Sequence, residues 1–250
     1  MKTLTAIILT LLLLTTNATA EPRKKILIVA SNMIDMGDLE KHDARNNLWE
    51  FAPPYHIFVS HGFDVDFVSP KGGKIEFMMD PLGISSYTIK YEGFLEKTNS
   101  SLSPAQTDPN DYWGVFIGGG YGVMFDVADN KEIHTIISRV YESGGIVGVG
   151  GHGSAGIVNV KLSNGEFLVK EKKVAGFPNS TEKSKSWAKQ GTLLPFLIES
   201  QLNKNGAIAQ NKKTLKDKHA VVVDQRIIST MFLPPAAIVA KEMILLKEAK

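Results

Sequence analysis

The sequence predicts an α/β protein with a mostly parallel β-sheet and helices on both of its faces. Apolar runs of strand length alternate with segments of helical spacing along most of the chain. The runs at 24–32 and 146–150 are the clearest strands, and their apolar character is typical of parallel strands buried on both faces. This alternation predicts that helices connect the parallel strands. Because no repeat, low-complexity tract or linker interrupts it, we expect a single domain over residues 21–250.

The first half of the chain predicts three strands and one helix. Lys24–Asn32 forms the first strand. Pro53–Gly62 opens with prolines and closes with glycine, which is typical of a helix. Phe63–Pro70 alternates apolar and polar residues and stops at a proline, as a strand does. Tyr112–Gly122 predicts a strand that runs into a glycine loop, and the polar segment Asn99–Pro109 before it predicts a surface loop.

The second half continues the same alternation. Lys131–Gly145 carries its isoleucines on one helical face and ends in glycine. Ile146–Gly150 is the next strand, and we expect a helix after it. His219–Thr230 has the pattern of a hairpin with Gln225 and Arg226 at its turn. The remaining predicted elements are a strand near 172–177 and helices over 193–206 and 235–248.

Residues 1–20 have the pattern of a secretory signal peptide. One lysine precedes an apolar core, and Ala18-Thr19-Ala20 fits an A-x-A cleavage site. The apolar run is too short for a comfortable membrane span, although an uncleaved anchor is the alternative. We therefore expect an exported protein, periplasmic or secreted, with no membrane contact after cleavage.

Composition and charge narrow the possible partners. The formal net charge is +2 and no basic stripe carries interleaved aromatic residues, so we expect no nucleic-acid partner. The chain has no cysteine, which excludes disulfides, thiolate metal sites and a cysteine nucleophile. His42, His56 and His61 lie close together in the sequence, but their spacing matches no zinc motif, so we expect no metal.

The stretch GGIVGVGGHGSAGIV, Gly144–Val158, admits two interpretations. Read literally, it contains the G-x-G-x-x-G fingerprint of a dinucleotide site. That site normally belongs to the first βα unit and needs an acidic residue about 20 positions further on. The available acids, Glu166 and Glu171, fall in a lysine-rich, loop-like segment. We therefore expect no nucleotide cofactor.

The second interpretation is a nucleophile elbow, in which a sharp turn after a strand lifts one side chain into a cleft. His152 supplies a base or a hydrogen-bond donor beside this turn, and the following helix N-terminus favours an anion. Gly119 and Gly120 in the second loop, IGGGYG, are candidates for backbone donors to an oxyanion. The small residues that a crowded turn requires are Gly150, Gly151, Gly153 and Ser154.

A family pattern runs through nearly all of residues 21–250. It is carried by WEFAPPYHIFVSHGFDVDFVSPKGGK, MMDPLG, DYWGVFIGGGYGVMFDVADN, GGIVGVGGHG, KKVAGFPNSTEKS, LLPFLIESQLNKNGA and VVVDQRIIST. Taken together, these segments resemble the ThiJ/PfpI superfamily of class I glutamine amidotransferase-like proteins. That superfamily includes the parkinsonism-associated deglycase and the heat-shock chaperone and glyoxalase III proteins. The resemblance implies a three-layer, flavodoxin-like sandwich and a protein that is often a homodimer.

The departures from this pattern bear on the chemistry. The resemblance implies a reactive cysteine before the His-Gly of the elbow, where this chain has Gly151. It implies a loop histidine where this chain has Tyr121, which would fill that space or line a pocket. It implies an acid that orients the elbow histidine where this chain has Asn179, with Glu182 nearby as a substitute. The family's proton-moving glutamate corresponds to Glu50.

These residues predict a protein that has lost its nucleophile. The expected site contains Glu50, the vacated position Gly151, His152 and Asn179, and Ser154 would face another direction from the vacated position. We expect a non-enzymatic or nearly inactive protein that binds a small carbonyl or anionic metabolite, or one that holds damaged proteins. The alternative is a glyoxalase III-like lyase or hydrolase that acts through Glu50 and His152 without a cysteine. The predicted ligand contacts are Gly119, Gly120, Tyr121, Gly153 and Ser154.

Overall fold

The computed structural model describes residues 25–78, 93–185, 193–217 and 219–248. The predicted signal peptide and the Asp80-Pro81 step of MMDPLG lie outside these residues. Within the described ranges, no helix combines the length and apolarity needed to cross a bilayer.

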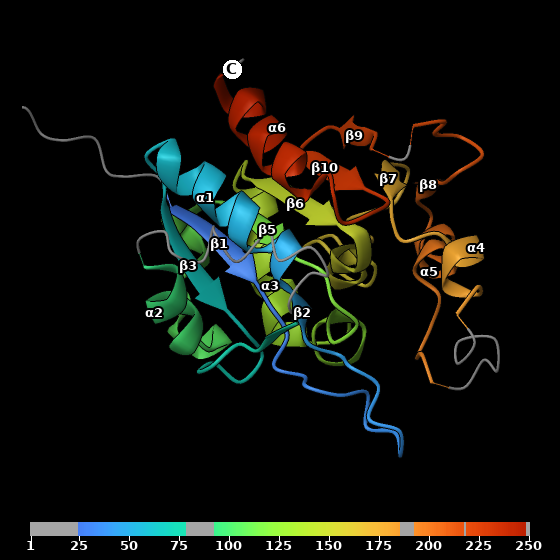
Figure 1. The fold of residues 1–250 in the computed structure, drawn as a ribbon. Coiled ribbons are helices and arrows are strands. Elements are labelled where there is room, and N and C mark those ends of the chain that lie inside the picture. Colours follow the sequence, from blue (N-terminus) through green and yellow to red (C-terminus); the bar gives the residue numbers. More distant parts are fainter. Residues whose placement is uncertain (1–24, 79–92, 186–192, 218, 249–250) are drawn as a thin grey trace, which may run out of the picture.

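A six-stranded sheet with the order β3-β1-β5-β6-β10-β9 forms the centre of the molecule (Figure 1). All neighbouring strands are parallel except β9 and β10, which form an antiparallel hairpin at one edge. The predicted mostly parallel, flavodoxin-like α/β sheet is therefore confirmed. The hairpin turn falls at Gln225 and Arg226 as predicted, and Gln225 adopts a positive φ of 53° there. The strands are β1 (Lys25–Val29), β3 (Asp64–Val68), β5 (Tyr112–Ile117), β6 (Ile146–Gly150), β9 (Val221–Asp224) and β10 (Ile227–Thr230).

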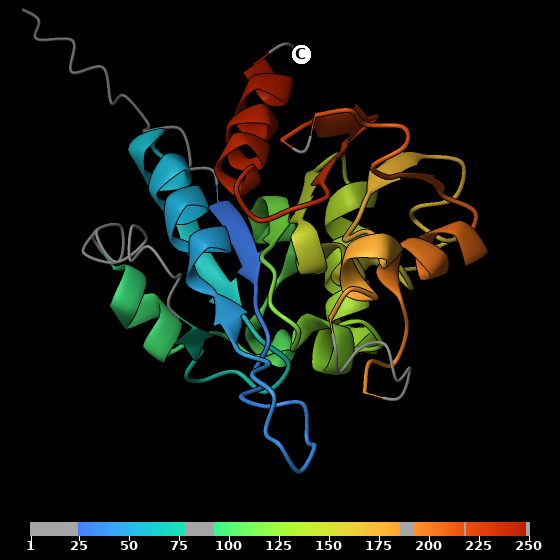
Figure 2. The same ribbon diagram turned by 45° about the vertical axis from the view of Figure 1, so that its right-hand side comes forward.

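Helices cover both faces of this sheet (Figure 2). In both views α1 and α6 lie side by side on one face, and α3 lies against the other. Alternate residues of β1 point to the two layers, because successive side chains of a strand leave it on opposite sides. Ile26 and Ile28 join the core with α1 and α6, whereas Leu27 and Val29 join the core with α3. These helices are α1 (Ala52–Ser60), α3 (Lys131–Glu142) and α6 (Ala236–Glu248).

Smaller elements surround the sheet. The predicted strand near 172–177 is present, but it pairs with β8 in a separate two-stranded sheet. A second small parallel pair joins β2 to β4. The sequence patterns missed β2, β4 and β8, which are only two or three residues long. The bounds are β2 (Asn46–Asn47), β4 (Phe77–Met78), β7 (Lys173–Ala175), β8 (Ile208–Gln210), α2 (Phe94–Asn99), α4 (Asn179–Glu182) and α5 (Ile198–Lys204).

Three predicted segments differ from the structure. The helix expected after β6 is a 3₁₀ helix, Gly151–Ile157, because its glycines disfavour an α-helix. The helix expected over 193–206 begins only at Ile198, since Pro195 disfavours helical backbone in the residue before it. The predicted loop Asn99–Pro109 contains the short 3₁₀ turn Pro104–Gln106 and begins with the last residue of α2.

The glycines of the elbow give a direct stability test of this packing. A Cβ at Gly153 would lie 2.3 Å from the backbone oxygen of Ile117 in β5, which cannot yield without moving the strand. We expect Gly153→Ala to lower the free energy of unfolding by about 1–3 kcal/mol. Gly150→Ala is the matched control, because its Cβ would meet nothing closer than 3.4 Å. Urea unfolding of the two variants checks this, and equal stabilities would contradict the packing described.

Candidate functional site

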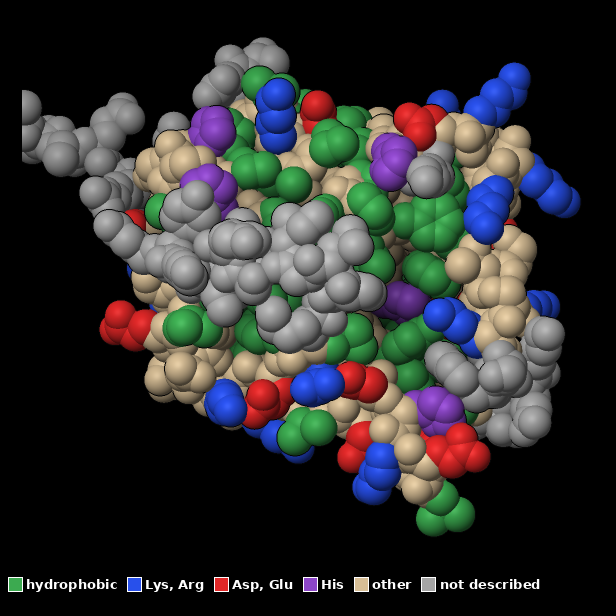
Figure 3. Space-filling model, viewed as in Figure 1, with side chains coloured by type: hydrophobic (Ala, Val, Ile, Leu, Met, Phe, Trp, Pro, Cys, Tyr) green, Lys and Arg blue, Asp and Glu red, His purple; other side chains and the backbone are tan. Residues whose placement is uncertain are grey.

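The predicted site residues converge where three neighbouring strands end. β1, β5 and β6 are adjacent and parallel, so the segments that follow them meet at one edge of the sheet. The loop Gly118–Gly122 follows β5 and the elbow at Gly151 follows β6. Figure 3 shows a hollow on the face turned to the viewer, where hydrophobic side chains gather around a histidine.

Glu50 is placed at this edge by a short 3₁₀ helix, Leu48–Glu50. The side chain of Asn47 caps this helix by accepting a hydrogen bond from the backbone N–H of Trp49 at 3.1 Å. The backbone N–H of Asn47 also donates to the carbonyl of Gly119 at 2.9 Å. Glu50 is therefore fixed directly to the loop after β5.

The carboxyl group of Glu50 is fully buried between two glycine turns. A Cβ built on Gly119 would lie 2.2 Å from Oε2, and one built on Gly151 would lie 2.8 Å from Oε1. Glycine at both positions leaves room for the carboxyl group in its present place, and a side chain at either position would require the carboxyl group to shift. In the described part of the chain, neither oxygen has a hydrogen-bond partner. Burial raises the pKa of Glu50 well above its usual value, which favours the neutral acid.

Gly151 adopts the backbone conformation of an elbow. Its φ of 48° lies in the left-handed region that glycine enters without strain. The hydroxyl of Ser154 donates to the carbonyl of Gly151 at 2.6 Å and closes the turn. This hydrogen bond aims the hydroxyl of Ser154 at the backbone of the turn.

His152 lies in a buried cluster of rings and one carboxylate. Its Nε2 is 2.8 Å from Oε2 of Glu182, and both side chains are almost fully buried. The ring of His152 stacks on Phe177 at a centroid distance of 4.0 Å, and the ring of Tyr121 lies 4.3 Å away. The hydroxyl of Tyr121 donates to Oε1 of Glu182 at 2.9 Å. Burial and the nearby charge of Glu182 raise the pKa of Tyr121.

Asn179, the position where the family pattern implies an acid, forms hydrogen bonds with α5. Its backbone N–H donates to Glu199 and its side-chain amide donates to Ser200, each at 2.8 Å, so it faces α5. Glu182, at the end of the same helix α4, is the acid that bonds His152. Glu182 is the substitute that the sequence analysis named for the acid that the family pattern implies at position 179.

Gly120 positions the loop after β5 and is itself covered by backbone. Its φ is 138°, and a Cβ there would lie 2.5 Å from the carbonyl oxygen of Arg45. Gly120 therefore packs against the segment that leads to Glu50.

Asp126 is a half-buried acid at the same edge that the sequence patterns did not single out. It belongs to a π-helix, Val123–Val127, and its Oδ2 accepts the backbone N–H of Asn32 at 2.8 Å. Burial raises the pKa of Asp126 to about 6. π-Helices are frequent at functional sites, but the spacing of residues in the sequence does not predict one. Asp126 ties the end of β1 to the loop after β5.

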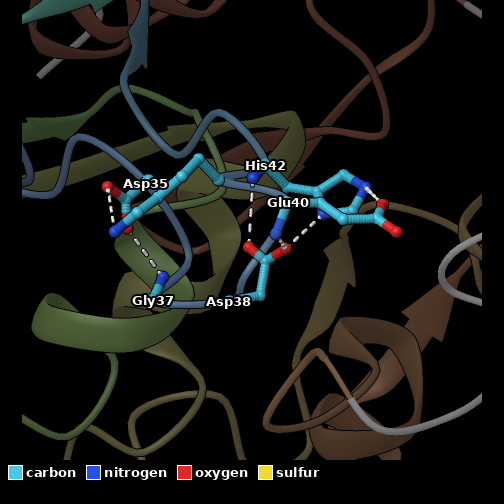
Figure 4. Close-up of polar contacts among 6 residues, drawn as sticks. Asp35, Gly37, Asp38, Glu40 and His42 are labelled. Atoms are coloured by element: carbon cyan, nitrogen blue, oxygen red, sulfur yellow. Dashed lines mark hydrogen bonds and ion pairs between the residues drawn. The ribbon is translucent and has the colours of Figure 1, made fainter.

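The loop between β1 and β2 is held by its own acidic side chains (Figure 4). Asp38 accepts backbone N–H groups from Glu40 and His42, each at 3.0 Å, and its Oδ2 lies 2.8 Å from the ring nitrogen Nδ1 of His42. Asp35 accepts the backbone N–H of Gly37 at 2.9 Å. The imidazole ring of His42 thus contacts carboxylates of its own loop. Across the described ranges, no group of three acidic, histidine or cysteine side chains is arranged to hold a metal ion.

Comparison with known proteins identifies relatives of this chain. No family model matches the chain. A probable glutathione-independent glyoxalase of Saccharomyces cerevisiae is 29% identical over 157 residues, which is 57% of this chain and 64% of that relative's length. The chain thus matches somewhat less than two thirds of that curated relative.

Solved structures match over more of the chain. Rapid Encystment Protein 24 KDa of Francisella tularensis is 26% identical, covering 88% of this chain and 97% of its own, with a TM-score of 0.77. Glyoxalase III of Candida albicans has a TM-score of 0.76 at 24% identity, over 89% of this chain and 96% of its own. A ThiJ/PfpI domain protein of Brachyspira murdochii has a TM-score of 0.60 at 16% identity, over 91% and 99%. These similarities show that the chain has the fold of ThiJ/PfpI domain proteins and that glyoxalases of the glyoxalase III type are among its relatives.

Proposed function

We propose that this chain binds a small carbonyl compound at the elbow and does not turn it over by covalent catalysis. One observation carries the proposal: the carboxyl group of Glu50 lies where the side chain of residue 151 would begin. In this proposal Gly151 occupies the position of the missing nucleophile. The nearest side-chain group to that position is then an acid without a hydrogen-bond partner among the described residues.

Covalent catalysis requires a nucleophile, and the chain supplies none at the elbow. The sequence contains no cysteine, and Gly151 has no side chain. Ser154 is the nearest hydroxyl in sequence, but its hydrogen bond to the carbonyl of Gly151 directs it away from a ligand. A dicarbonyl compound would therefore bind without forming an adduct to the elbow.

The chemistry of Glu50 identifies the ligand group. A neutral carboxylic acid is a hydrogen-bond donor, and a carbonyl oxygen is a matching acceptor. A buried donor without a partner is costly, so a ligand oxygen that accepts this hydrogen bond gains affinity. His152, fixed by Glu182, provides a second polar contact at the same edge of the sheet.

A glyoxalase III-like lyase or hydrolase is the rival candidate. It is favoured by the pairing of His152 with Glu182, which resembles a general base with its orienting acid. General acid–base catalysis by Glu50 and His152 alone would contribute roughly 10²–10⁴-fold to the rate. Export through residues 1–20, a homodimer and a role in holding damaged proteins also belong to the proposal, and the family resemblance and the signal pattern support them.

Methylglyoxal consumption by the purified protein distinguishes these candidates. We expect no consumption by the wild-type chain and a gain of activity in Gly151→Cys, since the substitution restores a nucleophile. Gly151→Ala is the matched control, because it adds the same Cβ against Glu50 without a thiol. Saturation-transfer NMR should show methylglyoxal bound to the wild type and bound more weakly to Glu50→Gln. Wild-type turnover that Glu50→Gln abolishes would instead establish the rival enzyme.

Burial of Glu50 also predicts how stability depends on pH. The folded state binds the proton of Glu50 more tightly than the unfolded state, because burial raises the folded pKa. The stabilising contribution of the protonated Glu50 carboxyl is therefore fully present below the pKa that Glu50 has in the unfolded chain. It is lost as the pH rises through the pKa of Glu50 in the folded protein, by at most about 1.4 kcal/mol per pH unit. Glu50→Gln should remove this slope above pH 5, whereas Glu96→Gln on the exposed side of α2 should keep it. Urea titrations between pH 5 and pH 9 check this, and identical slopes in Glu50→Gln and wild type would show that Glu50 is ionised in the fold.

A further inference from the structure

Glu182 receives two hydrogen bonds from residues that are far apart in the sequence. Oε2 lies 2.8 Å from Nε2 of His152, and Oε1 accepts the hydroxyl of Tyr121 at 2.9 Å. Glu182 is only 3% exposed, so water contributes little to solvating its charge. A buried carboxylate is tolerated when its oxygens accept hydrogen bonds, and these two donors occupy one oxygen each.

These contacts determine where the protons lie. A carboxylate can only accept hydrogen bonds, so both the phenol of Tyr121 and Nε2 of His152 act as donors. The ring of His152 also contacts Tyr121 from the loop after β5 and stacks on Phe177, while Glu182 reaches it from α4. Glu50 lies against the neighbouring Gly151.

The backbone of Tyr121 is held in place on both sides. Gly120 packs against Arg45 and Asn46, where no Cβ would fit. The carbonyl of Tyr121 accepts the backbone N–H of Met124 at 3.0 Å, at the start of the π-helix. The phenol therefore reaches Glu182 from a turn whose backbone is constrained.

We propose that Tyr121 is a positioning residue for His152 and acts through Glu182. Its hydroxyl holds the carboxylate in one orientation, so that Oε2 stays aimed at Nε2 of His152 and fixes the orientation of the imidazole ring. The use of that ring as a ligand contact rests on the proposed function. The orientation of His152 by Glu182 and Tyr121 does not depend on it.

Nitrogen-detected NMR of the histidine rings in the full protein tests this assignment. In the wild type, His152 should show the Nε2–H tautomer. Tyr121→Phe keeps the ring against His152 but removes the donor, so the carboxylate of Glu182 loses one of the two contacts that hold its orientation. We expect the Nε2 resonance of His152, recorded at one fixed pH, to shift and broaden because its hydrogen bond to Glu182 loosens.

Tyr112→Phe is the matched control, because the hydroxyl of Tyr112 donates to a carboxylate of Asp66 at 3.1 Å at the start of β5. It should leave the Nε2 resonance of His152 unchanged. A Tyr121→Phe protein with the wild-type Nε2 resonance would overturn the assignment. If Tyr121→Phe does not fold, the wild type still decides: the assignment requires a slowly exchanging hydroxyl proton on Tyr121, and rapid exchange overturns it. Failure of methylglyoxal to bind the wild type would remove the proposed function and leave the His152 spectrum as a separate result.

Discussion

The buried carboxyl group of Glu50 is the constraint on which the geometry of this edge of the sheet depends. Gly119 and Gly151 lie directly against it, and the backbone of Asn47 bonds Gly119 beside it. The loops after β5 and β6 and the segment that enters α1 are thereby joined at one point. Burial disfavours the charge of Glu50 and raises its pKa well above the usual value, and this favours the neutral acid. The left-handed turn at Gly151 is retained, but a carboxyl group fills the space in front of it.

A second buried acid sits beside the first and behaves differently. Glu182 accepts hydrogen bonds from His152 and Tyr121, whereas Glu50 has no such partner in the described residues. The two carboxyl groups thus meet different environments, one without hydrogen-bond donors among the described residues and one with two. In the proposed function, this contrast provides a neutral donor and an oriented imidazole for an uncharged carbonyl group. The glyoxalases among its relatives share the fold, and under the proposal this chain differs from them in lacking a nucleophile at the elbow.

Much of the fold was readable because periodicity and turn residues report local structure directly. β6 has the predicted bounds, and the hairpin turn falls at Gln225 and Arg226. The convergence of Glu50, Gly151 and His152 followed from the family pattern, not from spacing. Glu182 was named as the substitute for the acid at position 179, but its contact with His152 could not be derived from spacing, because it depends on which way the four-residue helix α4 faces. The contact of Tyr121 with Glu182 could not be predicted from spacing either, because the two residues lie 61 positions apart in the sequence.

Infrared difference spectroscopy between the wild type and Glu50→Gln at neutral pH tests the protonation of Glu50 most directly. The stretching band of a neutral carboxylic acid is separate from the bands of a carboxylate, and the substitution isolates the one group of interest. We predict that the wild type shows a neutral-acid band that Glu50→Gln lacks, and that it shifts when methylglyoxal is added. A carboxylate band in its place would mean that Glu50 is ionised in the folded protein. The proposed donor to the ligand would then not exist.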